Sequence, residues 1–284
     1  MNTRTIRLVL LAAGTACVFS APADADVVID WNSTVVDISA QAPGPAGGPG
    51  PRTRTSAIAQ VAIHAALNSI ETRYDPYVDL PPASPGASPE AAVAAAAYFT
   101  LAQLVPSTIV ELDAIYAQRL AELPPCPAKY PTCVADGIAA GETAALAILA
   151  LRSGDGSDTL NLPYTLLPGP GVHQPTPPAF APPMFAGMAS ITPFAMREGW
   201  QFRAAPSEVL DLGSEVYTQD YLEVRRVGAA DAEADGNRTP EQSAIARYWP
   251  GGGVDWNAIA RLILAGRDLD LWEHARLFAL LTLH

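Results

Sequence analysis

The chain has 284 residues, of which 49% are hydrophobic and 16% are charged, so it can bury a substantial core and is not natively disordered. Its 29 acidic residues outnumber its 17 basic ones, which makes nucleic acid and anionic membrane surfaces poor partners. The 27 prolines beside many alanines indicate helices joined by stiff connections.

The first 25 residues have the pattern of a secretory signal peptide. Arg4 and Arg7 precede an apolar run over residues 8–21, and Ala23 and Ala25 supply the small residues of a cleavage site. The run is short for a membrane-spanning helix, which needs about 20 residues. We therefore expect cleavage after Ala25 and an exported product, periplasmic or extracellular, without a membrane span.

Helical periodicity accounts for most of the remaining chain. Asp30 is the expected N-cap of a first helix, which ends in the proline-rich residues 43–51. Further helices are predicted over residues 53–72, 90–104, 109–116, 134–151, 207–227, 239–249, 255–265 and 269–284. The two that flank Pro106 are expected to form an antiparallel hairpin. Because no run of alternating strands occurs, the predicted class is all-α, a helical bundle.

The predicted helix over residues 53–72 is apolar except for one narrow stripe of polar residues. Gln60, His64 and Asn68 fall on this stripe because spacings of four residues stay on one side of a helix. We interpret the three as a buried polar seam that hydrogen-bonds to neighbouring helices, with the lining of a pocket as the alternative.

Cysteine usage agrees with export. Removal of the leader takes away Cys17 and leaves Cys126 and Cys133, which we expect to form a local disulfide that pins a helix connection. A reactive or metal-binding thiol pair is the alternative, but it would need a histidine or a second cysteine pair close by.

Two stretches depart from the helical pattern. Residues 157–206 contain ten prolines and several aromatic residues without helical period, which predicts an extended strap that wraps the helical body. The last predicted helix stays apolar up to His284 without a glycine, proline or polar stop. We expect that this helix docks terminally or that the sequence is incomplete.

Motifs for known chemistry are sparse. No pair of the four histidines has metal-ligand spacing, and no Ser-His-Asp order stands out. Residues 231–236 imitate the start of a calcium loop, but its closing glutamate is replaced by Gln242. We interpret this stretch as a charged loop leading to a helix cap at Thr239.

Several short motifs nevertheless occur in a recognisable order. The first are Val28-Ile29-Asp30-Trp31-Asn32, Ala62-Ile63-His64-Ala65-Ala66, Asn68-Ser69-Ile70 and Arg73-Tyr74-Asp75-Pro76-Tyr77. Later ones are Pro168-Gly169-Pro170-Gly171-Val172, Pro175-Thr176-Pro177-Pro178-Ala179-Phe180, Thr192-Pro193-Phe194, Gln201-Phe202-Arg203, Glu241-Gln242, Ile245-Ala246-Arg247 and Ala275-Arg276-Leu277-Phe278-Ala279-Leu280-Leu281. In this order they resemble the N-terminal half of bacterial vanadium-dependent haloperoxidase-like proteins, in the type 2 phosphatidic acid phosphatase superfamily.

This resemblance implies an all-helical enzyme in which positive side chains hold vanadate and one histidine bonds to it. Peroxide bound there oxidises halide, and phosphatase relatives use the equivalent pocket on a phosphoester. An oxyanion needs converging cationic and N–H donors. The family supplies them from three motifs: a lysine followed after six residues by Arg-Pro, then Pro-Ser-Gly-His, then Ser-Arg followed closely by histidine.

None of the three motifs occurs in this sequence. The single lysine, Lys129, is followed seven places later by Asp136, and neither Ser107 nor Ser207 continues as Gly-His. We therefore assign no catalytic, cofactor-binding or metal-binding residue. We expect residues 26–284 to be the N-terminal helical portion of such a protein, without its catalytic C-terminal part and inactive alone. Vanadate is expected for a full-length relative, and the expected partners are the missing C-terminal half or a second copy.

Two other functions remain open at this point. One is a short secreted helical module with a binding or structural role and no catalysis. The other is an acid phosphatase-like relative, because haloperoxidases and these phosphatases share the missing motifs.

Overall fold

The computed structural model describes residues 26–169, 172–203, 211–249 and 253–284. The predicted signal peptide and part of the helix predicted over residues 207–227 lie outside these ranges. Within them all regular structure is helical and there is no strand, which confirms the predicted all-α class.

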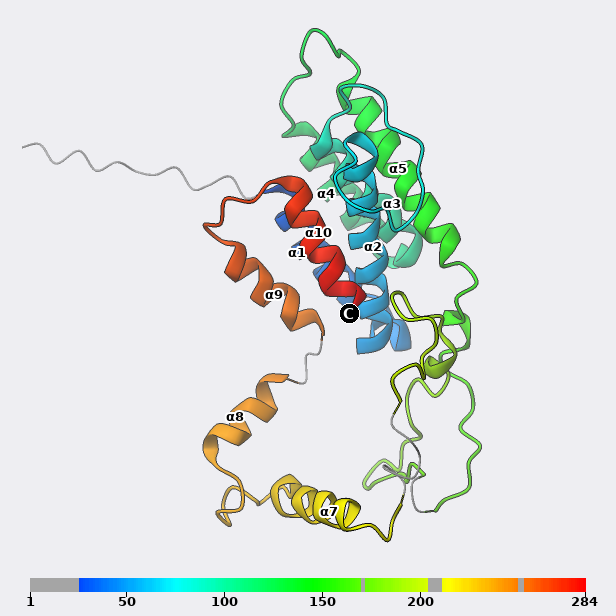
Figure 1. Ribbon diagram of the computed structural model, residues 1–284, viewed down its shortest axis with the longest axis vertical. Coiled ribbons are helices and arrows are strands. Elements are labelled where there is room, and N and C mark those ends of the chain that lie inside the picture. Colours follow the sequence, from blue (N-terminus) through cyan, green and yellow to red (C-terminus); the bar gives the residue numbers. More distant parts are fainter. Residues whose placement is uncertain (1–25, 170–171, 204–210, 250–252) are drawn as a thin grey trace, which may run out of the picture.

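Nine α-helices and four short 3₁₀ turns make up the described part of the chain (Figure 1). The α-helices are α1 Val27–Ala40, α2 Pro49–Ile70, α3 Pro89–Leu104, α4 Ile109–Ala121, α5 Cys133–Leu151, α7 Glu215–Gly228, α8 Pro240–Tyr248, α9 Gly253–Leu264 and α10 Leu271–Leu283. The 3₁₀ turns are η1 Gly44–Gly47, η2 Pro106–Thr108, η3 Ser157–Thr159 and η4 Met188–Ser190.

Helix α2 is the centre of the bundle. It contacts α1, α3, α5 and α10, and every residue from Ser56 to Asn68 is buried. Trp31 from α1 and Phe278 from α10 are buried in the same core. An apolar helix is stable in water only when other elements enclose it, and the contacts of α2 with four other helices provide this enclosure.

Helices α3 and α5 pack unusually close together because α5 presents glycines to an alanine-rich partner. A Cβ atom placed on Gly137 would lie 2.4 Å from the carbonyl oxygen of Ser88. One placed on Gly141 would lie 2.3 Å from the carbonyl oxygen of Ala92. Since neither backbone can move without disturbing its helix, these two positions require glycine.

Helix α5 also meets the length and composition expected of a membrane span, as does the bent pair of α3 with the segment that contains α4. Core helices of water-soluble proteins pass the same test.

The helix ends follow capping chemistry, with one correction to the sequence analysis. The N-cap of α1 is Asp26, whose carboxylate accepts from the backbone N–H of Val28 at 2.8 Å. Asp30, the predicted cap, lies inside the helix and pairs with Arg119 at 3.0 Å. At α8, Thr239 forms a reciprocal capping box with Gln242, as expected for a helix start at that position.

The connection between α3 and α4 also differs from the prediction. The chain bends by 112° across η2, so the two helices form an open corner and not an antiparallel hairpin. Val105 leaves helical geometry with φ −131° and ψ 59°, as a residue before proline tends to do, and η2 lasts only three residues. The stacked rings of Tyr98 and Tyr116, with centroids 4.2 Å apart, close the inside of the corner.

The two cysteines that follow residue 25 lie at disulfide distance. The Cα atoms of Cys126 and Cys133 are 5.6 Å apart and their sulfurs are bonded. The backbone N–H of Ser88 donates to the carbonyl oxygen of Cys133 at 2.8 Å. The disulfide loop is therefore tied both to the start of α5 and to the N-cap of α3.

Within its described residues, 157–169 and 172–203, the proline-rich strap touches the bundle in one region and is otherwise largely exposed. Tyr77 donates its hydroxyl to the carbonyl oxygen of Phe194 at 2.9 Å, while residues 161–169 and 172–186 are largely exposed. The expectation that the strap wraps the helical body is therefore wrong for most of its length. Prolines remove backbone N–H donors, and a segment rich in them has few means to bond along a helix surface.

Helices α7 and α8 stand away from the bundle, whereas α9 returns to pack on α1 and α10 (Figure 1). No residue of α7 is buried, although Val216 and Val224 are large and apolar. After α5 the chain meets the bundle again where the strap contacts Tyr77 and Arg152, departs from it for α7 and α8, and rejoins it with its last two helices.

Candidate functional site

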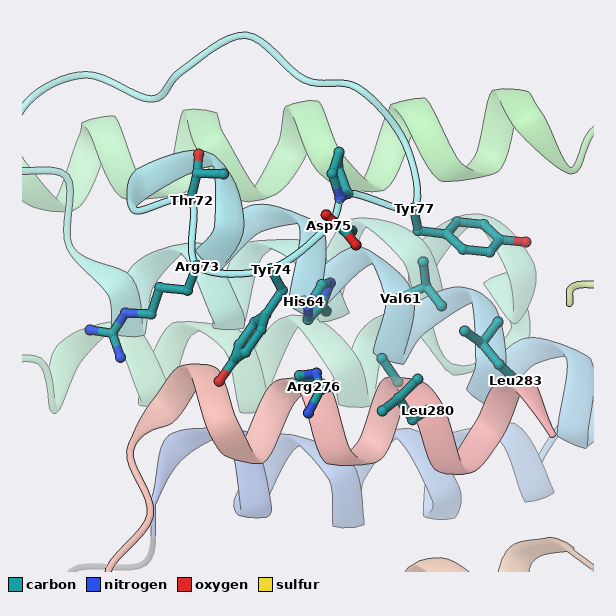
Figure 2. A pocket seen from close by; sticks show the side chains of 12 residues that line it. Val61, His64, Thr72, Arg73, Tyr74, Asp75, Tyr77, Arg276, Leu280 and Leu283 are labelled. Atoms are coloured by element: carbon teal, nitrogen blue, oxygen red, sulfur yellow. The ribbon is translucent and has the colours of Figure 1, made fainter.

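A cavity of about 630 Å³ lies between α2, α10 and the loop over residues 72–77 (Figure 2). We call it the α2–α10 pocket. Its polar side chains gather around the loop, and apolar side chains of α2 and α10 complete the wall. The lining residues are Val61, His64, Thr72, Arg73, Tyr74, Asp75, Pro76, Tyr77, Arg276, Ala279, Leu280 and Leu283.

Asn68 fixes the loop that forms one wall of this pocket. Its carboxamide oxygen accepts from the backbone N–H groups of Arg73 and Tyr74 at 3.0 and 3.1 Å. Its amide nitrogen donates to the carbonyl oxygen of Tyr74 at 2.8 Å. One buried side chain therefore satisfies three backbone groups just beyond the end of α2, where a helix leaves its carbonyl groups unpaired and the chain must turn.

A second clamp joins the same loop to α10. The guanidinium of Arg73 pairs with Glu71 at 2.9 Å and with Asp270, and it lies over the Trp272 ring, 4.3 Å from the centroid. The indole N–H of Trp272 reaches the last turn of α2 and donates to the carbonyl oxygen of Leu67 at 2.9 Å. The loop is thus held from both helices.

His64 faces the pocket from α2. Only 8% of the residue is exposed, its ring stacks on Tyr74 with centroids 5.9 Å apart, and its ring nitrogens have no hydrogen-bond partner among the described residues. Burial lowers the pKa of the imidazole, and the charge of Arg276 lowers it further. His64 is therefore a neutral group with one N–H and one lone pair.

Arg276 approaches the pocket from α10. Its guanidinium lies over the Tyr74 ring at 4.9 Å from the centroid, so Tyr74 is shared between Arg276 and His64. In the part of the chain that the structure describes, Arg276 has no carboxylate partner. It differs in this respect from Arg73, which has two.

The three residues of the predicted polar seam, Gln60, His64 and Asn68, lie in three different environments. Asn68 bonds to the loop backbone and His64 lines the pocket. Gln60 stays in the interior with no exposed surface, and neither polar atom of its amide has a partner within the described ranges. The alternative that the sequence analysis left open, a pocket-lining role, describes His64.

A buried ion-pair cluster, which the sequence analysis did not predict, lies at the other end of α2. Asp155 accepts from Arg54 at 2.8 Å and from Arg152 at 2.8 Å. Burial by itself raises the pKa of Asp155, but the hydrogen bonds from Arg54 and Ser157, with the charge of Arg54, outweigh it and hold the pKa below its usual value. The partners come from α2 and the end of α5, so no local pattern could reveal the cluster.

Arg152 also fastens the strap to this cluster. It donates to the carbonyl oxygen of Thr192 and, at 3.2 Å, to that of Pro193. Its guanidinium lies 3.9 Å from the centroid of the Phe194 ring. The cluster therefore joins α2, α5 and the strap, and its role is structural.

Two polar bridges join α1 to the last helices. Asn32 donates to Asn257 at 2.7 Å and accepts from Arg261 of α9. Asp26 lies 2.6 Å from the ring of His274 in α10. These contacts between groups more than 220 residues apart fix the end of the chain against its beginning.

Comparison with known proteins identifies a relationship at the level of the fold. No family model matches the sequence, and no curated protein matches it. The structure is similar to the crystal structure of the first bacterial vanadium-dependent iodoperoxidase, with a TM-score of 0.67 and 20% sequence identity. The match covers 90% of this chain and 64% of that chain. The chain thus has a vanadium haloperoxidase-like fold and spans less than two thirds of that neighbour.

The residues of the α2–α10 pocket do not fit vanadate. An oxyanion of this kind needs several free cationic groups and N–H donors that converge on it. In the α2–α10 pocket Arg73 is already engaged by two carboxylates, which leaves Arg276 and the neutral His64. The ammonium of Lys129 lies over the ring of its neighbour Tyr130 in the disulfide loop. Nor does any group of three or more His, Cys, Asp or Glu among the described residues have the placement of a metal site.

Proposed function

We propose that this chain is an exported vanadium haloperoxidase-like protein that does not hold vanadate with its own residues and is inactive alone. In full-length relatives the family chemistry is peroxide-dependent oxidation of halide at bound vanadate. The fold likeness to the iodoperoxidase over 90% of the chain supports the relationship. The lack of the three vanadate motifs in all 284 residues supports inactivity.

The single lysine carries most weight in this proposal. The family's first motif begins with a lysine that contacts the oxyanion. The side chain of Lys129 is exposed and follows Cys126 in the disulfide loop, and Lys129 is not among the residues that line the α2–α10 pocket. A site that needs a lysine cannot be assembled from this chain.

The test is an assay of the purified chain with orthovanadate, peroxide and iodide or bromide, with an organic acceptor to trap oxidised halogen. We expect no turnover above the protein-free background, and a vanadium iodoperoxidase assayed in parallel provides the positive control. Turnover that depends on both vanadate and peroxide would contradict the proposal. Hydrolysis of a chromogenic phosphate ester would favour the acid phosphatase-like alternative. Circular dichroism must show that the sample is helical and melts cooperatively. A lack of turnover can then be assigned to the folded chain and not to misfolded protein.

Export and association belong to the same proposal. Expression with the native leader should yield secreted protein whose first residue is Asp26, as read by N-terminal sequencing. The exposed apolar side chains of Val216, Val224, Leu262 and Ile263 on α7 and α9 support association with a second copy or with a chain that supplies the rest of a peroxidase fold. Light scattering of the purified chain should show a mass above that of the monomer, and a monomer would exclude self-association.

A secreted binding module is the second candidate, and one observation favours it. The α2–α10 pocket presents the guanidinium of Arg276, which has no carboxylate partner among the described residues, and the ring of His64, which has no hydrogen-bond partner among them, although the groups of this pocket do not fit vanadate. A pocket with these groups can bind a ligand without catalysis.

A further inference from the structure

The two arginines of the α2–α10 pocket differ in what they contact. Arg73 is neutralised by Glu71 and Asp270 and serves to hold the loop. Arg276 has no carboxylate within ion-pair distance among the described residues, and Asp75, the acidic residue of the lining, is exposed and on the opposite side of His64 (Figure 2). The guanidinium of Arg276 therefore offers a planar set of N–H donors of the kind that binds a carboxylate bidentately.

His64 gives the second indication of a ligand. More than nine tenths of the residue is buried, yet its ring nitrogens bond to no described residue and the ring forms part of the pocket wall. Its N–H therefore faces the pocket without a protein partner among the described residues, and a ligand in the pocket can accept from it.

The rest of the wall is apolar. Val61 from α2 and Leu280 and Leu283 from α10 lie at the end of the pocket beyond Arg276 (Figure 2). Ala279 of α10 belongs to the same lining. Leu280 is 42% exposed, so a ligand that covered it would gain hydrophobic contact. The cavity volume of about 630 Å³ lies within the usual range of small-molecule sites, roughly 300–1,000 Å³.

We propose that the α2–α10 pocket binds a small organic carboxylate with an apolar tail. Arg276 pairs with the carboxylate, His64 donates one N–H to it, and the tail lies along Val61 and the apolar side chains of α10. One free guanidinium and one neutral donor match the single charge of a carboxylate. A multiply charged inorganic oxyanion would need more cationic partners than this pocket offers.

The wall is pre-organised for such a ligand. Asn68 fixes the backbone of the loop, and Trp272 joins the loop region to the last turn of α2. Tyr74 lies between the loop and α10, with its ring against both His64 and Arg276. A ligand that enters this pocket therefore does not need to order the groups that bind it, and this lowers the entropic cost of binding.

Calorimetric titration of the full chain with octanoate tests the proposal. We expect saturable binding of one octanoate per chain, and binding weaker by roughly tenfold or more in Arg276→Gln, because a hydrogen-bonded charge pair of this kind contributes about 1.5–3 kcal/mol. Arg247→Gln removes the same charge from an exposed position on α8 and should leave the affinity unchanged. Each variant must first show the helical content and thermal midpoint of the parent chain.

Other probes separate the role of the carboxylate from that of the tail. Octan-1-ol should bind at least roughly tenfold more weakly than octanoate, and so should inorganic phosphate, which lacks the tail. Leu280→Asp, at a partly exposed site, should weaken octanoate binding by charge repulsion and loss of apolar contact. The proposal is overturned if octanoate shows no saturable binding, if Arg276→Gln binds it as tightly as the parent chain, or if either octan-1-ol or phosphate binds as tightly as octanoate.

Discussion

Burial keeps the His64 imidazole uncharged, and the stability of the protein should depend on pH for that reason. Because burial and the charge of Arg276 lower the pKa of His64 in the folded state, the unfolded chain binds more protons below the ordinary histidine pKa of about 6.5. The free energy of unfolding should therefore fall as the pH drops below that value, by up to about 1.4 kcal/mol per pH unit. The fall ends where the folded protein itself protonates His64.

Denaturant unfolding of the parent chain and of His64→Gln between pH 7.5 and 5.5 measures this effect. The variant should lose less stability over the interval, because glutamine does not titrate. His173→Gln, at an exposed position of the strap, should behave like the parent chain. Equal pH dependence in the parent chain and in His64→Gln would show that His64 carries no shifted titration.

At the scale of single residues, the sequence could predict which side chains share one side of α2, but not which residues of other elements they contact. Helical spacing put Gln60, His64 and Asn68 on one stripe. Their surroundings are set by the loop over residues 72–77 and by α10, which lies more than 200 residues further along the chain. A pattern within one helix contains no information about a partner that arrives from so far away, and so Arg276 could not be predicted as a neighbour of His64.

At the scale of helices, the close packing of α5 on α3 predicts the effect of one methyl group. Alanine in place of glycine inside a helix normally stabilises by about 1 kcal/mol. At Gly141 the added Cβ would lie 2.3 Å from the carbonyl oxygen of Ala92, so we expect Gly141→Ala to destabilise by about 1–3 kcal/mol.

Denaturant unfolding measures this change, with Gly228→Ala as the matched control. A Cβ at Gly228, the last residue of α7, would make only an ordinary contact, at 3.8 Å, with the side chain of Val224. That variant should show no loss of stability. A gain of stability in Gly141→Ala would mean that the two helices separate easily.

The extents of the helices were largely predictable, because proline and glycine end them and apolar periodicity fills them. Their junctions were not. Both Asp26 and Asp30 suit an N-cap, and the choice between them depends on Asp26 also meeting His274 of α10. The corner between α3 and α4 likewise depends on the ring stacking of Tyr98 and Tyr116, a contact that neither helix contains alone.

At the scale of the whole molecule, Asp155 joins three separate parts of the chain. Asp155→Asn keeps the volume of the side chain but leaves the guanidiniums of Arg54 and Arg152 without their shared carboxylate. We expect a loss of about 3–5 kcal/mol in the free energy of unfolding, as for other buried pairs that lose one partner. The strap should also become more sensitive to proteolysis, because Arg152 orients its contact with Thr192.

The stabilisation by Asp155 also depends on pH, but for a different reason from that of His64. Ion pairing favours the charged form of Asp155, whereas burial disfavours the charged form of His64. The pKa of Asp155 is held below its ordinary value in the folded state, so its stabilisation is present above about pH 4 and is lost as the pH falls through the folded-state pKa. Asp158→Asn, an exposed change in the same loop, is the control and should alter neither stability nor proteolysis. If Asp155→Asn melts like the parent chain, the cluster does not hold the strap.

The strap is closed at its base, and this determines how the chain would tolerate inserted sequence. The backbone N–H of Thr192 donates to the carbonyl oxygen of Asp155 at 2.8 Å, and that of Gly187 donates to Leu160 at 3.0 Å. The chain leaves the bundle at Leu160 and returns beside the same point at Gly187. Since doubling the length of a closed loop costs only about 0.6 kcal/mol, the exposed stretch near Leu166 and Leu167 is a natural position for grafting a peptide or a small domain.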